Sequence, residues 1–135
     1  MIERYERVAL QLRLQNPRRF AADRLRLRRR EVETDAIRLV EKRYAEPIVV
    51  VCARLREQER VLRDTADLTE RMLDALPLAD GTVLRTMFVE GREDAVPWLL
   101  AKLHVSRSQL YRIRDRALDK MAVMMGWDEE LEMSN

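Results

Sequence analysis

The chain has 135 residues, with 26 Lys and Arg, 24 Asp and Glu, and a formal net charge of +2. This length suits one domain, or one small domain with an extension. The 47% hydrophobic fraction suffices for a core, Gly and Pro are few, and β-branched residues do not alternate as in strands, so we predict an all-α fold. The single Cys52 and the single His104 exclude an intrachain disulfide and a metal site built from several Cys or His.

Membrane association is not expected. The longest apolar run, residues 48–53, is far too short to span a bilayer. The N-terminus is charged from Glu3 and lacks the apolar region of a signal peptide. We therefore expect a cytoplasmic protein.

The N-terminal part, residues 1–75, is predicted to be helical. Apolar residues recur at helical spacing through residues 2–15, 18–44 and 48–76. Asn16-Pro17 and Glu46-Pro47 are expected to separate these stretches. Thr34-Asp35 is a candidate N-cap that would divide the second stretch into two helices. We therefore predict that residues 1–75 form a helical hairpin or a coiled-coil-like arrangement.

The third stretch carries a stripe of heptad-like spacing about four repeats long. Charged residues flank the stripe, which is typical of a coiled coil or a helical hairpin. Two interpretations stay open: packing against the N-terminal helices of the same chain, and a homodimer through residues 48–76. The stripe consists of Ile48, Val51, Leu55, Leu62, Thr65, Thr69, Met72 and Leu76.

Residues 24–30 contain five Arg in seven positions. Such a run could contact phosphates. It could also be a solvated helix face balanced by Glu31, Glu33 and Asp35, and we favour this second interpretation because charge runs usually have that role.

A supporting helix is predicted after Leu76-Pro77. Asp80-Gly81-Thr82 is expected to form the turn that starts it, and Gly91 is expected to end it. Asp94 is expected to cap the helix that follows. The apolar face of the supporting helix would consist of Val83, Leu84, Met87 and Phe88.

Residues 95–121 are typical of two short helices joined by a tight turn. Leu99, Leu100 and Leu103 form the apolar side of the first helix. Ser106 is a good N-cap for the second helix, and Gln109 stands where a capping-box partner belongs. The second helix has an apolar side and several Arg, which is the outline of a helix-turn-helix DNA-binding element. That apolar side consists of Leu110, Ile113, Ala117 and Met121.

From Leu76 to Met121 the sequence resembles region four of bacterial sigma factors. The resemblance rests on Leu76-Pro77, Phe88, Gly91, the segment Leu103-X-Val105-Ser106 and the pair Ala117-Leu118. His104 departs from the pattern, since that family usually has Gly there. A Gly at this point serves a positive φ, which would cost a His about 1 kcal/mol. Pro97 also departs from it, but Pro is tolerated in the first turn of a helix.

The layout is similar to phage and prophage late transcriptional regulators of the autolysin-regulator type. The resemblance implies a phage or prophage origin, activation of a late or packaging operon, and RNA polymerase as a second partner. A complete sigma factor is not expected, because residues 1–75 offer only the scattered Tyr5, Phe20 and Tyr44 to capture flipped bases. We expect three segments: a helical region that could oligomerise (1–75), the DNA-binding module (76–125) and an acidic tail lying away from the duplex (126–135).

The expected function is sequence-specific recognition of double-stranded DNA, with the helix at 107–121 in the major groove. By resemblance, Arg107, Ser108 and Arg112 match positions that reach bases, and Gln109 and Tyr111 match positions near the DNA backbone. Arg is suited to guanine and Gln to adenine. Arg114, Arg116 and Lys120 are better suited to contacts with phosphates.

Two alternatives stay open: a DNA-packaging protein of the small-terminase type, and a helical adaptor that does not bind DNA. The terminase type usually places its DNA-binding element first, whereas here it comes last. An enzyme is not expected, because the sequence has no phosphate-binding Gly-rich loop, metal-ligand cluster or nucleophile–base arrangement. No cofactor is expected.

Overall fold

The computed structural model describes residues 2–37 and 47–127, and these residues form helices without any strand. The all-α fold is therefore confirmed. The chain divides into unit 1, Met1–Asn16 with Leu68–Asn135, and unit 2, Pro17–Asp67. Several residues with predicted roles, Leu39, Val40, Tyr44 and most of the acidic tail, lie outside the described residues.

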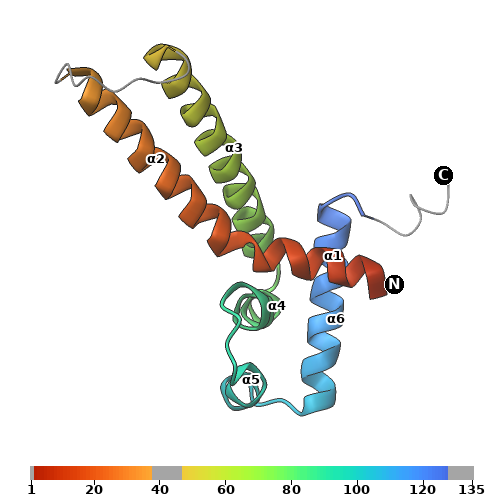
Figure 1. The fold of residues 1–135 in the computed structure, drawn as a ribbon. Coiled ribbons are helices and arrows are strands. Elements are labelled where there is room, and N and C mark those ends of the chain that lie inside the picture. The colour runs from red at the N-terminus through yellow and green to blue at the C-terminus, as the bar shows by residue number, and fades with distance from the viewer. Residues whose placement is uncertain (1, 38–46, 128–135) are drawn as a thin grey trace. The chain divides into compact units, whose positions relative to one another are not determined.

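The first two helices are α1 (Ile2–Arg13) and α2 (Gln15–Ile37) (Figure 1). Pro17 is the third residue of α2, where a missing N–H leaves no helical hydrogen bond unmade. The predicted division at Thr34-Asp35 is wrong, since α2 continues through both residues. Val32 packs beside them against α3, and this tertiary packing outweighs the local capping signal.

Unit 2 contains most of α2 and most of the long helix α3 (Ile48–Ala75). Its core is small: Val32 of α2 lies against Val51 and Cys52 of α3. Arg63 of α3 also bonds Asp23 of α2 over 2.9 Å. All eight residues of the stripe predicted between Ile48 and Leu76 are buried or half-buried. Ile48, Val51 and Leu55 belong to the core of unit 2. For that part of the stripe, packing within the chain is therefore favoured.

The Arg run on α2 is partly neutralised within unit 2. Arg28 pairs with Glu31 over 3.2 Å. Arg29 lies 3.9 Å from Glu33 and 3.6 Å from Glu59 of α3. Arg28 therefore fits the solvated and ion-paired interpretation, whereas Arg29 is ion-paired but half-buried.

Unit 1 places α1 in the same core as the C-terminal helices, and Figure 1 shows α1 beside α6. Val8 and Leu12 of α1 are fully buried together with Leu84 and Met121. This arrangement differs from the expected boundary between residues 75 and 76, because the module needs the apolar side of α1 to complete its core.

The supporting helix begins earlier than predicted. It is α4 (Leu78–Leu84), which follows Pro77 directly. The predicted turn at Asp80-Gly81-Thr82 is wrong, since these residues lie inside α4. Gly81 instead permits a close approach, because a Cβ there would meet the Leu73 carbonyl oxygen at 3.2 Å.

A short π-helical segment, η1 (Arg85–Val89), continues α4. The Glu90 N–H donates to the Arg85 carbonyl five residues back, over 2.8 Å. This segment brings Phe88 onto the core that contains α1. Gly91 then ends it with φ of 61°, so the predicted helix-ending role of this Gly is confirmed.

Candidate nucleic-acid interface

Two helices joined by a three-residue turn form the candidate interface. They are α5 (Ala95–Leu103) and α6 (Arg107–Met124). Leu99 of α5, Leu110 of α6 and Val83 of α4 are fully buried and pack into one cluster. This cluster fixes the two helices against each other and against the supporting helix.

His104 ends α5 in the left-handed conformation, with φ of 55° and ψ of 47°. This is the positive φ that the resemblance implied at this position. A side chain with a Cβ is strained there, whereas Gly is not. The turn therefore keeps its expected geometry at an energetic cost.

Ser106 and Gln109 form the predicted capping box at the start of α6. The Gln109 N–H donates to the Ser106 hydroxyl oxygen over 3.2 Å, and the Ser106 N–H donates to the Gln109 side-chain oxygen over 2.8 Å. Gln109 is therefore engaged in the cap. Asp94, by contrast, makes no side-chain cap bond at α5. It pairs with Arg92, whose hydrogen bond lowers the pKa of the Asp94 carboxyl.

The first two turns of α6 present the predicted base-contacting residues to solvent. Arg107, Ser108 and Arg112 are all exposed, and Tyr111 is half-buried. Ser108 and Arg112 are four residues apart and so lie on the same side of the helix. Within the described part of the chain, neither Arg107 nor Arg112 makes an ion pair, so their guanidinium groups remain available to an anionic partner.

In the second half of α6, unlike at its start, two cations bind a buried acid. Asp80 of α4 is fully buried. Arg116 donates to it over 2.6 and 3.3 Å, and Lys120 donates to it over 3.2 Å. Burial would raise the pKa of Asp80, but these hydrogen bonds outweigh that effect and lower it. A phosphate contact by Arg116 or Lys120 would thus compete with Asp80.

The remaining charges of this half of α6 are also paired. Arg114 bonds Asp115 over 2.9 Å and lies 4.7 Å from the centre of the Tyr111 ring. Asp119 accepts a hydrogen bond from the buried Arg4 of α1. Along α6, the cations that form no ion pair with a described residue therefore lie at its N-terminal end.

The sequence interpretation missed a third cation near this end, Lys102 of α5. Its ammonium lies 4.7 Å from the centre of the Trp98 ring. Arg92 lies over the same ring at 4.6 Å, although it also pairs with Asp94. Lys102 makes no ion pair with any residue that the structure describes. The available signal was its position four residues after Trp98, which places both on one side of the helix.

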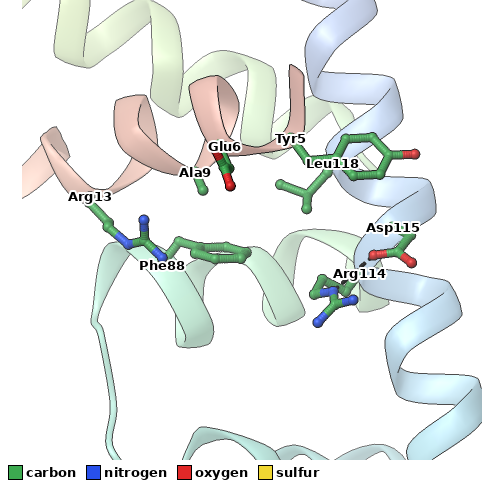
Figure 2. Close-up of a pocket in the computed structure, with 8 residues that line it drawn as sticks. All are labelled: Tyr5, Glu6, Ala9, Arg13, Phe88, Arg114, Asp115 and Leu118. Atoms are coloured by element: carbon green, nitrogen blue, oxygen red, sulfur yellow. Dashed lines mark hydrogen bonds and ion pairs between the residues drawn. The ribbon is translucent and has the colours of Figure 1, made fainter. Parts of the chain in front are cut away.

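A shallow hollow of about 190 Å³ also lies on unit 1, between α1, η1 and α6 (Figure 2). Figure 2 shows Phe88 and Leu118 beside it and Arg13 next to the Phe88 ring, whose centre is 5.4 Å from the guanidinium carbon. Small-molecule sites usually enclose about 300–1,000 Å³. The hollow is thus smaller than such a site and could accept little more than one side chain.

No cluster of His, Cys, Asp or Glu within residues 2–37 and 47–127 could hold a metal ion. In the same ranges, no helix has the length and apolar character needed to cross a membrane. No family model, curated protein or solved structure matches the chain. We therefore infer the function from the geometry and charge of α5 and α6.

Proposed function

We propose that the chain is a sequence-specific double-stranded DNA-binding transcriptional regulator that acts in the cytoplasm. The N-terminal end of α6 enters the major groove and reads base edges with Arg107, Ser108 and Arg112. The observation that carries this proposal is the contrast along α6. The cations at its start are exposed and pair with no acid in the part of the chain that the structure describes, whereas the cations after Arg112 are internally paired.

The local geometry supports the same proposal. A recognition helix approaches DNA with its N-terminal residues. The capped start of α6 is held by the buried cluster of Leu99, Leu110 and Val83, so its first turn is fixed relative to α5. Exposed Arg side chains on a fixed helix can form bidentate bonds with guanine. Lys102, at the end of α5, is suited to an adjacent phosphate.

The first experiment measures affinity for random duplex DNA at two salt concentrations. Contacts with phosphates release counterions, so binding should weaken steeply as salt rises. The second selects bound sequences from a random duplex pool and should return a common base pattern. Absence of binding at low salt would exclude DNA recognition and favour the adaptor alternative.

RNA polymerase is a second partner within this proposal, and it rests on the resemblance alone. Transcription from a promoter that carries the selected site would test it. Activation that requires both the site and the chain supports polymerase contact. Site binding without any effect on transcription would favour a packaging role.

A further inference from the structure

The outer face of α3 is the most distinctive surface that the proposed function leaves unused. Val50, Val61 and Leu68 are 45%, 50% and 51% exposed, although large aliphatic side chains usually lie inside proteins. Exposed Arg54, Glu57 and Asp64 lie between them. Together these six residues follow one another at steps of four and three, which places them along a single side of the helix. We name this set the outer stripe.

The neighbouring side of α3, about 100° around the helix from the outer stripe, is already occupied. The stripe predicted from the sequence is buried or half-buried, and its first part packs on Val32. The core of unit 2 contains few large side chains, and helices in proteins gain most of their stability from tertiary packing. A further helix against the outer stripe would therefore add the apolar contact that unit 2 lacks.

The order of residues in the outer stripe identifies the occupant. When the outer stripes of two copies run antiparallel, Val50 of one copy lies opposite Leu68 of the other. Arg54 then lies opposite Asp64, and Glu57 lies opposite Val61. Each of these pairs occurs twice, as a twofold axis requires. A parallel arrangement would instead oppose Arg54, Glu57 and Asp64 to their own copies, with like charges at three of six positions.

We propose that the outer stripe pairs with the outer stripe of a second copy of the chain, antiparallel across a twofold axis near position 59. The contact is apolar at its two ends, has an Arg54–Asp64 pair next to each end, and sets Val61 opposite Glu57 near the axis. Arg60 bonds Glu57 and Asp64 of its own helix over 2.9 Å each and remains beside the contact. This self-association does not depend on DNA binding.

Sedimentation equilibrium of the full chain between about 10 µM and 1 mM tests the proposal. The wild-type chain should be dimeric at the upper end of this range. Val61→Glu should abolish the dimer, because it introduces a second carboxylate opposite Glu57. A matched control is Leu27→Glu, since Leu27 is exposed to a similar degree on α2; it should leave the dimer intact. Circular dichroism confirms that each variant keeps its helix content.

Charge exchange tests the arrangement itself. Arg54→Asp and Asp64→Arg should each raise the dissociation constant about tenfold, because each replaces two attractive pairs by two repulsive ones. The double exchange should restore the wild-type value. A monomer at every concentration, loss of the dimer in Leu27→Glu, or failure of the double exchange to restore association would overturn the proposal. Rescue of Arg54→Asp by Glu57→Arg instead would overturn the stated register.

Discussion

Asp80 offers the sharpest test of how α6 is held, because the carboxylate and its two cations differ in exposure. The Asp80 side chain is fully buried, whereas the side chains of Arg116 and Lys120 are 56% and 43% exposed. Replacing both cations by Met keeps much of their apolar length but leaves a buried carboxylate without a cation. Replacing Asp80 by Asn leaves two cations that water can reach.

The two changes should therefore have unequal costs. Removing one side of a buried ion pair costs about 3–5 kcal/mol, and we expect about 3 kcal/mol for Arg116→Met with Lys120→Met, since the half-exposed location admits solvent screening. Asp80→Asn should cost about 1 kcal/mol, because it loses charge-assisted hydrogen bonds without leaving a buried charge. Adding Asp80→Asn to the double Met variant should recover about 2 kcal/mol of the loss.

The pH dependence follows from the direction of the pKa. In the wild-type chain the folded pKa of Asp80 lies below its ordinary 3.8. Its contribution to stability is thus present above that ordinary value and is lost as the pH falls through the lowered one. Without the two cations, burial should raise the pKa of Asp80, so acid protonates the carboxylate and relieves the penalty. The deficit of the double Met variant should shrink between pH 7 and about pH 4.

Urea unfolding followed by tryptophan fluorescence measures these differences. The chain has two tryptophans, Trp98 and Trp127, and both belong to unit 1, so the signal reports the unit that contains Asp80. Equal costs for Asp80→Asn and the double Met variant, or a deficit of that variant that is independent of pH, would show that the two cations do not compensate the buried Asp80 charge.

Two further variants test the turn and the cap. His104→Gly should raise the free energy of unfolding by about 0.5–1 kcal/mol because Gly relieves the left-handed strain; His104→Ala, which keeps a Cβ, is the control, and an equal gain there would contradict the strain argument. Ser106→Ala should lower the free energy of unfolding by about 1 kcal/mol through loss of the cap bond. Ser108→Ala, at the exposed second residue of α6, should change it by less than about 0.5 kcal/mol in the same urea titration.

Local chemistry was predictable from the sequence wherever the partners lie within a few residues. The capping box of Ser106 and Gln109 is a three-residue pattern, and the left-handed turn at His104 follows from the usual Gly at that point. The helical periodicity around Leu99 and Leu110 likewise identified buried residues, because it depends only on spacing along one helix.

Long-range pairings were not predictable in the same way. Asp80 and Arg116 are 36 residues apart, and nothing in either segment marks them as partners, so the sequence alone places Arg116 among the phosphate contacts. The burial of Val8 and Leu12 beside Met121 also depends on tertiary packing, which places α1 in the same unit as α5 and α6. The wrong turn at Asp80-Gly81-Thr82 arose because Gly usually marks a turn, whereas Gly81 here allows close packing.

We propose that the exposed start of α6, and not its internally paired second half, reads DNA. The most direct measurement compares the affinities of Arg112→Ala and Arg116→Ala for a duplex selected from the random pool and for an unrelated duplex. We predict that Arg112→Ala loses about 1–3 kcal/mol on the selected duplex and much less on the unrelated one, while Arg116→Ala loses little on either. Equal losses for the two variants, or an Arg112→Ala loss that is the same on both duplexes, would contradict the claim.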